Sequence, residues 1–200
     1  MTADKTPDHE RLIAWVDVET TGLDPERGSV LEVGIILTDM AIVEIAEWSR
    51  VVAFWGPVDE AISTMHGPTG SGLLTPDSYH DCNDGWYTGT NEARASHPSV
   101  VAETGAEWLR SHCGDVAPLW GGRNPHFDRG WLRHHMPALH DAIHYRSIDE
   151  TTLRITLAAW AGIKVPKAES GTAKHRVLDD LRESLRVSRE FRSACGRMRP

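Results

Sequence analysis

The sequence lacks several features that would assign it to particular protein classes. Its three cysteines, Cys82, Cys113 and Cys195, are odd in number and far apart, which argues against a disulfide framework and against a thiolate zinc site. No apolar run approaches the roughly 20 residues that cross a membrane. The first ten residues have neither the basic start nor the apolar stretch of a signal peptide. We therefore expect a cytoplasmic protein with no membrane association.

Positive charge is also scarce. The chain has 21 Lys and Arg against 29 Asp and Glu, a formal net charge of −8. Proteins that grip long nucleic acids by their phosphates are usually basic, so this composition does not provide a long basic groove. An acidic protein can still act on polynucleotides where bound metal ions supply positive charge locally. Short oligonucleotides or single-stranded ends are therefore the easiest nucleic acids to accommodate.

The length and composition fit one globular domain. The chain has 200 residues, of which 40% are hydrophobic, and this suffices to bury a sizeable core. We expect residues 1–10 to form a flexible N-terminus, residues 11–194 the single domain and residues 195–200 a C-terminal tail.

Hydrophobic periodicity predicts strands followed by alternating helices and strands. The expected strands are one that carries Asp17 and Glu19, then 29–38, 41–55, 116–120 and 145–148. The expected helices are 98–113, 127–136, 151–161 and 177–191. Residues 66–97 are dense in Gly, Pro, Ser, Asp and Asn and should form a surface excursion. The pattern predicts a mixed α/β sheet covered by helices, opened by a three-strand antiparallel meander.

The first chemically informative motif is an apolar run that ends in two acids, Asp17 and Glu19, before a turn. Side chains alternate faces along a strand, so both carboxylates point to the same side. Two carboxylates so placed repel each other unless a cation lies between them, and a hard divalent ion is the natural occupant. Taken alone, however, two such acids also mark the solvated end of an edge strand.

Two further motifs lie later in the chain. Asp128 follows the strand exit of Gly121-Gly122-Arg123-Asn124-Pro125-His126-Phe127, and His175 and Asp180 open the final predicted helix. Singly, each has an ordinary explanation, because an acid at a helix start usually complements the helix dipole. Their joint occurrence, with compatible strand and helix placement, favours one metal-dependent nuclease centre.

These three motifs resemble those of the DEDDh family of 3′→5′ exonucleases, and the resemblance spans nearly the whole chain. The resemblance implies a ribonuclease H-like fold, in which the antiparallel meander continues into parallel strands. Within that family the chain is most similar to the oligoribonucleases. The similar segments are Met65-His66-Gly67, Ser71-Gly72-Leu73, His144-Tyr145-Arg146 before Asp149, and the run from His175 to Ser184.

The resemblance implies a hydrolase with two divalent cations, Mg²⁺ or Mn²⁺, about 3.5–4 Å apart. Asp17 would bridge both ions, Glu19 and Asp180 would share one, and Asp128 would act on the other. Carboxylate oxygens suit these hard ions. His175, a residue type that titrates near neutral pH, would be the general base for the attacking water.

The same resemblance implies a substrate of short RNA or single-stranded 3′ ends, cut to 5′-mononucleotides, and a homodimer. Leu23 would wedge against the terminal bases, Arg146 would grip a 5′ phosphate, and Tyr145 would reach across the dimer or simply fill the sheet. The remaining expected substrate-binding residues are Thr20, Gly22, His66, Asn124 and Phe127.

Two departures leave other functions open. Asn124 stands where oligoribonucleases tend to carry a serine and is typical of proofreading and tRNA-trimming members, and the loop over 75–91 is longer than usual. A proofreading or trimming exonuclease is therefore one alternative, and a catalytically silent nucleic-acid-binding domain is another. We assign no role to His134 and His135, and Trp86-Tyr87 is a candidate for base stacking.

Overall fold

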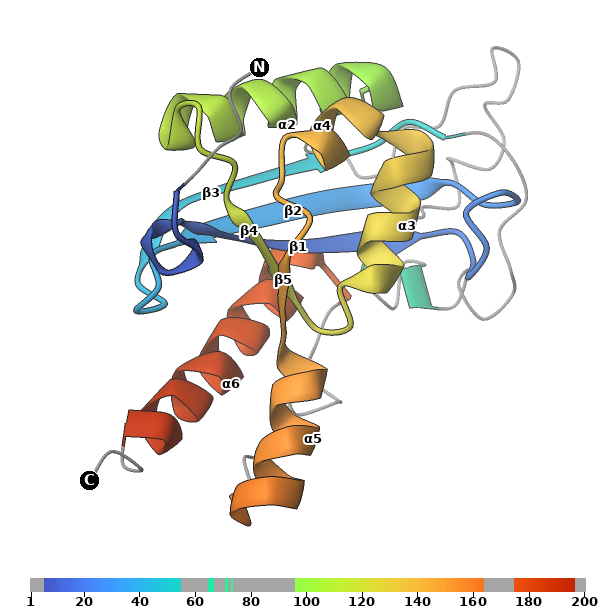
Figure 1. Ribbon diagram of the computed structural model, residues 1–200. Coiled ribbons are helices and arrows are strands. Elements are labelled where there is room, and N and C mark those ends of the chain that lie inside the picture. Colours follow the sequence, from blue (N-terminus) through green and yellow to red (C-terminus); the bar gives the residue numbers. More distant parts are fainter. Residues whose placement is uncertain are drawn as a thin grey trace, which may run out of the picture.

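The computed structural model describes residues 6–54, 65, 66, 71, 73, 96–163 and 175–196. Its centre is a five-stranded sheet in the order β3-β2-β1-β4-β5 (Figure 1). The strands are β1 (Ile13–Thr20), β2 (Val30–Thr38), β3 (Glu44–Val51), β4 (Leu119–Gly122) and β5 (Ser147–Asp149). The first three form an antiparallel meander, and β4 and β5 continue the sheet parallel to β1. The predicted mixed sheet is confirmed.

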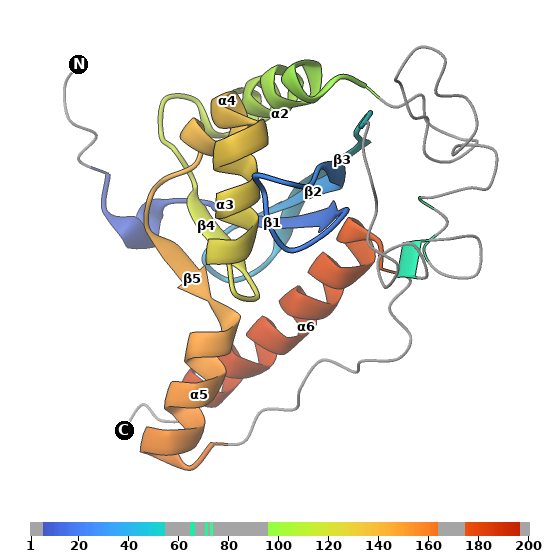
Figure 2. The same cartoon turned by 90° about the vertical axis from the view of Figure 1, so that its right-hand side faces the viewer.

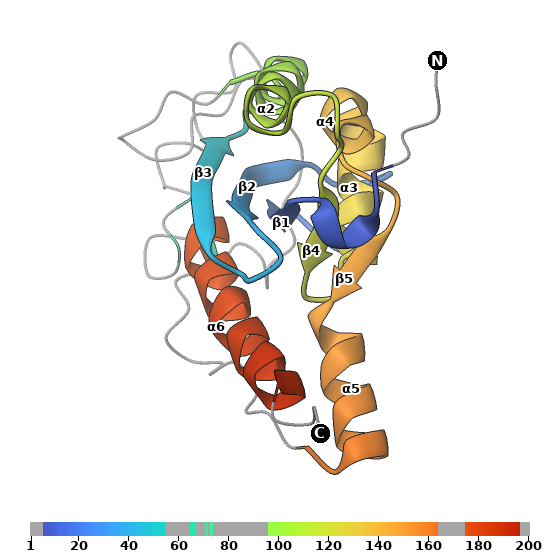
Figure 3. The ribbon, with the colours of Figure 1, turned by 60° about the vertical axis from the view of Figure 1, so that its left-hand side comes forward.

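The helices cover both faces of this sheet. They are η1 (Asp8–Glu10), α2 (Pro98–Cys113), α3 (His126–His135), α4 (Pro137–Asp141), α5 (Glu150–Ala161) and α6 (Val177–Gly196). Helices α2, α3 and α4 lie on one face and α6 lies on the other, while α5 extends away from the end of β5 (Figures 1 and 3). Among the described residues, no helix combines the length and the apolar character needed to cross a membrane.

Side chains alternate along β1 and so contribute to two separate hydrophobic cores, one on each face of the sheet. Ala14, Val16 and Val18 point to the face of α2, α3 and α4 and join the larger core. Ile13 and Trp15 point to the opposite face and pack with Leu181 and Leu185 of α6. Asp17 and Glu19 continue the second series, so the strand period directs both carboxylates toward α6.

Several element bounds differ from those expected. Strand β3 starts at Glu44, not at residue 41, because the Asp39 side chain accepts hydrogen bonds from the backbone N–H groups of Ala41 and Val43 and prolongs the turn. Strand β4 begins at Leu119, not at residue 116, because its parallel pairing with β1 begins there, and it runs on to Gly122, which pairs with Asp149 of β5. Helix α6 continues past Phe191, and its late residue Ala194 is buried. Helices η1 and α4 were not predicted.

Two sequence expectations lie partly or wholly beyond this description. Most of the excursion expected over 66–97 falls outside the described residues. The division into residues 1–10, 11–194 and 195–200 stays a prediction.

Candidate metal centre and its surroundings

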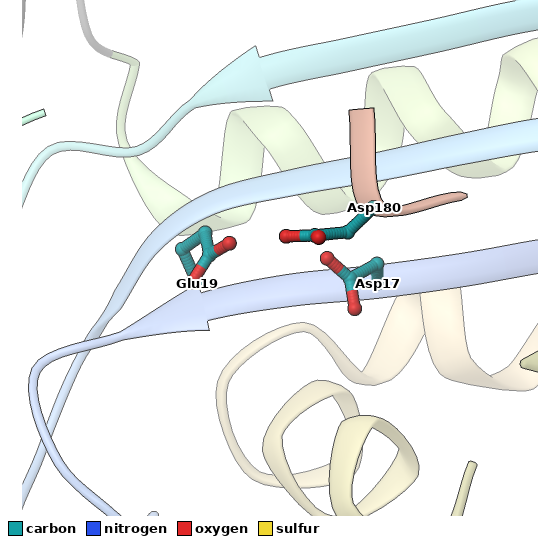
Figure 4. Close-up of side chains that lie close together, drawn as sticks. All are labelled: Asp17, Glu19 and Asp180. Carbon is teal, nitrogen blue, oxygen red and sulfur yellow. The ribbon is translucent and has the colours of Figure 1, made fainter. Parts of the chain in front are cut away.

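The carboxylates of β1 meet a third acid from α6. Asp180 lies in the first turn of α6 and faces the end of β1, where the side chains of Asp17 and Glu19 project (Figure 4). One ligand oxygen from each of the three residues lies within 4.8 Å of the other two. Figure 2 shows α6 crossing beneath β1 and β2, which brings residues far apart in sequence to one place.

Asp128 reaches the same strand from α3. Its side chain is 4% exposed, and its Oδ1 accepts a hydrogen bond from the Val18 N–H at 3.1 Å. Asp128 is not one of the three clustered acids, but it is close enough to raise the pKa of Asp17. The four acids expected from the sequence therefore converge around β1.

The charges of these acids oppose one another. Burial raises the pKa of Asp17 well above its ordinary value, and the nearby Asp128, Glu19 and Asp180 carboxylates raise it further. Burial also raises the pKa of Asp128 to about 7, although the Val18 N–H acts against this rise. For Asp180, burial and then Glu19 raise the pKa to about 6, while His175 and Arg123 act to lower it. A bound cation would relieve this repulsion.

The donor set fits hard divalent cations. All four side chains offer carboxylate oxygens, which Mg²⁺ and Mn²⁺ prefer, and no thiolate or imidazole belongs to the clustered acids. Asp17, Glu19 and Asp180 could hold one ion together, and Asp128 stands beside Asp17 for a second.

His175 lies just before α6 in a backbone conformation that non-glycine residues seldom adopt, with φ of 48°. The next residue, Arg176, fixes this segment through two hydrogen bonds to Glu32, at 2.9 Å from Nε and 2.7 Å from an Nη atom. Glu32 is 3% exposed and lies opposite Glu19 in the β1–β2 register. A buried carboxylate of β2 therefore holds the candidate base beside the acids.

His66 contacts a metal-ligand candidate, and its expected contact with substrate stays a prediction. Its side chain is 1% exposed, and its Nε2 lies 3.3 Å from Glu19 Oε2. Its Nδ1 lies 2.8 Å from the Ser71 hydroxyl, and its ring meets that of His175 at 6.3 Å between centroids. These contacts orient Glu19, in the way that outer partners commonly orient metal-binding carboxylates.

The turn after β1 presents Leu23 to solvent. Thr20, the last residue of β1, and Gly22 in the turn are both buried, and the Thr20 hydroxyl donates to the Gly22 carbonyl, whereas Leu23 is 80% exposed. His135 anchors the turn through a 2.9 Å hydrogen bond to the Pro25 carbonyl. His135 is thus a structural residue, which the sequence did not indicate.

Asn124 lies between β4 and α3, and Phe127 lies in the first turn of α3. Asn124 is exposed with φ of 62°, and its N–H donates to Asp149 Oδ1. Phe127 is half-buried against the ring of Trp131. Their expected substrate contacts stay predictions.

Tyr145 and Arg146 lie at the other end of the sheet. They precede β5, whose Ser147 is level with Trp120 of β4 and, through it, with Ala14 of β1. The site acids lie farther along β1. Tyr145 is 68% exposed, and Arg146 forms an ion pair with Asp8 at 2.9 Å. Trp86-Tyr87 and the loop over 75–91 lie outside the described residues.

The sequence analysis also missed the roles of Arg123 and Glu150 in the site. Arg123 directly follows β4, and its guanidinium lowers the pKa values of both Asp17 and Asp180. Glu150, the first residue of α5, is 3% exposed and lies 3.6 Å from the Arg123 Nε. No motif linked them, because they are 27 positions apart and meet only through the pairing of β4 with β5.

Curated relatives resemble the chain over most of its length. The chain is 30% identical to the oligoribonuclease of Aliivibrio fischeri over 190 residues, which cover 92% of this chain and 95% of that protein. It is 32% identical to the oligoribonuclease of Corynebacterium diphtheriae over 198 residues, or 94% of this chain and 84% of that protein. No protein-family model matches the chain.

Solved structures share the fold at lower identity. Exonuclease I of Escherichia coli in complex with a dT13 oligonucleotide superimposes with a TM-score of 0.68 at 14% identity, over 94% of this chain. Exonuclease I of Methylocaldum szegediense gives a TM-score of 0.65 at 18% identity, over 92% of this chain. The chain spans only 42% and 40% of those two proteins. Sequence identity to the oligoribonucleases, together with the four converging acids, shows that the chain belongs to the oligoribonuclease family of DEDDh 3′→5′ exonucleases.

Proposed function

We propose that the protein hydrolyses short RNA or single-stranded 3′ ends to 5′-mononucleotides, using two Mg²⁺ or Mn²⁺ ions held by Asp17, Glu19, Asp128 and Asp180. This proposal rests mainly on Asp17, Glu19 and Asp180, whose ligand oxygens lie within 4.8 Å of one another. The pKa values of Asp17 and Asp180 are raised. Such a set is unfavourable without a cation and suits a phosphodiester-cleaving centre.

Bound ions would orient the scissile phosphate, lower the pKa of an attacking water and stabilise the leaving 3′ oxygen. The side chains of the protein provide the proton transfer. An imidazole nitrogen of His175 accepts a proton from the water as its oxygen attacks phosphorus. The P–O3′ bond breaks, the 3′ oxygen takes up a proton, and the released nucleotide keeps the phosphate on its 5′ oxygen.

Glu19 needs a defined orientation to bind an ion, and His66 supplies it. The His66 Nε2 contacts one Glu19 oxygen at 3.3 Å while its Nδ1 is engaged with Ser71. The buried pair of Glu32 with Arg176 plays the corresponding role for His175. Both candidate ligand and candidate base are thus held by contacts already formed in the protein.

The substrate proposal rests on charge and on the exposed Leu23. A net charge of −8 disfavours a long backbone contact, so a few nucleotides near the 3′ end should dominate binding. Leu23, 80% exposed on an anchored turn, offers an apolar surface for a terminal base. The relatives at about 30% identity are named oligoribonucleases, which favours RNA over DNA.

We further propose that the active form is a cytoplasmic homodimer in which Tyr145 and Arg146 complete the site of the partner subunit. Their position at the start of β5, near the beginning of β1 and not its end, supports this. A mixture of Asp17→Asn and Arg146→Ala proteins tests it. One composite site would then carry both native residues, so mixing should restore activity, whereas no recovery in a light-scattering dimer would refute the arrangement.

A length series of 5′-labelled RNA and DNA, from two to about 20 nucleotides, tests the proposed function. We expect shortening from the 3′ end, release of 5′-mononucleotides, and the highest kcat/KM for the shortest RNA. Preference for long single-stranded DNA would favour a proofreading or trimming enzyme. Binding of the same oligonucleotides with no hydrolysis in Mg²⁺ or Mn²⁺ would favour the silent binding domain.

A further inference from the structure

We propose that Arg123, anchored by the buried Glu150, is a substrate-binding residue whose guanidinium contacts a phosphate group of the oligonucleotide. This inference rests on the proposed function and adds a cation to a site that is otherwise built from acids. Arg123 lies within the motif that leads to Asp128 but received no role there, and Glu150 belongs to none of the motifs of the metal centre.

The strand register places Arg123 on the catalytic side of the sheet. Trp15 of β1 is level with Gly121 of β4, and Arg123 follows two residues later, as Asp17 follows Trp15. A Cβ at Gly121 would touch Ile13 and Trp15, whose side chains face α6. Arg123, two residues on, therefore leaves β4 on the face where Asp17 also projects.

Glu150 fixes the guanidinium from the other side. Gly122 is level with Asp149 in the β4–β5 register, so Glu150 follows β5 just as Arg123 follows β4. The Glu150 side chain is 4% exposed and lies 3.6 Å from the Arg123 Nε, whereas the Arg123 side chain is 45% exposed. One edge of the guanidinium is thus held while its outer part faces solvent.

Across the sheet, the guanidinium of Arg123 lies between two carboxylate side chains, those of Asp17 and Glu150. Arg123 acts on Asp17 and Asp180 without forming an ion pair to either among the described residues. Its outer N–H groups stay available for a ligand that brings its own negative charge. Arginine binds phosphate oxygens through two N–H groups at once, and such charge-assisted bonds are the strong ones. The phosphates of a substrate seated on the acids supply this ligand.

A purely electrostatic role makes a different prediction from phosphate binding. If Arg123 only balances the acids, then removing its charge should tighten divalent-ion binding and leave substrate affinity unchanged. If it binds phosphate, removal should weaken substrate binding while ion affinity stays equal or improves. Measuring divalent-ion affinity and substrate affinity in the same variant therefore distinguishes electrostatic balance from phosphate binding.

The test compares Arg123→Gln, Arg123→Lys and Glu150→Gln with the native protein. Arg110→Gln is the matched control, because it removes one exposed arginine from α2 on the opposite face of the sheet. We expect Arg123→Gln to raise KM about tenfold, Arg123→Lys to recover most of this loss, and Glu150→Gln to raise KM about threefold. Calorimetry should show undiminished Mn²⁺ affinity in Arg123→Gln and weaker binding of a nucleoside 5′-monophosphate.

The salt dependence of affinity and a comparison of two dinucleotides identify which phosphate Arg123 contacts. The slope of log affinity against log salt should fall by about 0.7 in Arg123→Gln if one phosphate contact is lost. A dinucleotide with a 5′ hydroxyl has only the scissile phosphate, so an equal KM penalty there assigns the contact to that phosphate. A penalty seen only with a 5′-phosphorylated dinucleotide assigns it to the terminal one.

The inference fails if Arg123→Gln matches Arg110→Gln in KM and salt slope on every substrate, or if its Mn²⁺ affinity falls in parallel with its rate. Those results leave the exonuclease itself standing. A native protein that hydrolyses none of these substrates overturns the proposed function and this inference with it.

Discussion

Gly34 of β2 and Val177 of α6 are in direct contact, because a Cβ at Gly34 would lie 2.5 Å from Val177 Cγ2. Gly34 is also the partner of Asp17 in the β1–β2 register. The missing side chain lets the first turn of α6 approach the sheet at the level of the site. The position of Asp180 over Asp17 therefore depends on a residue with no side chain at all.

We predict that Gly34→Ala pushes the start of α6 away from the sheet. The added methyl group should destabilise the protein by about 1–3 kcal/mol through overpacking and should lower kcat by displacing Asp180. Denaturant unfolding and hydrolysis rates measure the two effects. Gly130→Ala, within α3 and with open space around its Cβ, is the control and should be neutral or stabilising.

The Glu32–Arg176 pair should matter more than an exposed pair of the same type. We predict that Glu32→Gln lowers the free energy of unfolding by about 1–3 kcal/mol and reduces kcat, because Glu32 is buried and its partner Arg176 directly follows His175. The control, Glu47→Gln, breaks the exposed pair with Arg182 and should cost under about 1 kcal/mol. Equal effects of the two substitutions would show that the buried pair does not position the base.

Most helices and strands were predictable because the sequence patterns that identify them are local. The alternation along β1, the apolar run of β2 and the proline and glycine that bound α2 each identify an element without knowledge of the others. The acids of the site were also predictable, since their motifs keep a recognisable order. Bounds were less predictable where tertiary pairing sets them, as at β4, whose start is fixed by Ile13 of β1.

The supporting contacts could not be predicted from the sequence. Glu32 lies within an apolar run, and nothing local shows that its partner is Arg176, 144 residues away. Glu150 and Arg123 likewise meet only through adjacent parallel strands. His135 looked like a surface residue, yet its ring stacks on Trp131 and binds the Pro25 carbonyl. Such contacts depend on three-dimensional proximity, which residue type and spacing do not encode.

The metal-free protein should lose stability as pH rises from about 4 to 7. Folding raises the pKa of Asp180 to about 6 and that of Asp128 to about 7, so the folded state binds more protons than the unfolded state across this range. The stability that comes from proton binding by Asp128 and Asp180 is complete below the unfolded pKa of about 3.9 and is lost as pH rises past their folded pKa values.

Thermal unfolding in chelator across this pH range, with Asp128→Asn as the comparison, measures the effect. The variant should gain at least about 1 kcal/mol over the native protein between pH 4 and pH 8. Saturating Mg²⁺ should reverse the loss in the native protein above pH 7, because the ion binds only the folded state. A native stability that rises with pH in chelator, in parallel with the variant, would contradict the raised pKa values.

His175 should move a proton without holding a metal ion. We predict that His175→Ala lowers kcat by about 10²–10⁴-fold while Mg²⁺ affinity changes little. Raising pH should partly restore the variant, because hydroxide then replaces the missing base. Calorimetry gives the ion affinity and single-turnover kinetics give the rate. Collapse of ion affinity, with activity restored by excess Mn²⁺, would identify His175 as a ligand instead.

The most direct test of the metal centre compares native protein with Asp17→Asn on a 5′-labelled short RNA, in Mg²⁺ and in chelator. Asp17→Asn removes one charge from the cluster, so it should abolish hydrolysis while the metal-free fold stays as stable as the native one or becomes more stable. The native protein should shorten the RNA from its 3′ end only when Mg²⁺ is present. Near-native hydrolysis by Asp17→Asn, or hydrolysis by the native protein in chelator, would contradict the two-metal assignment.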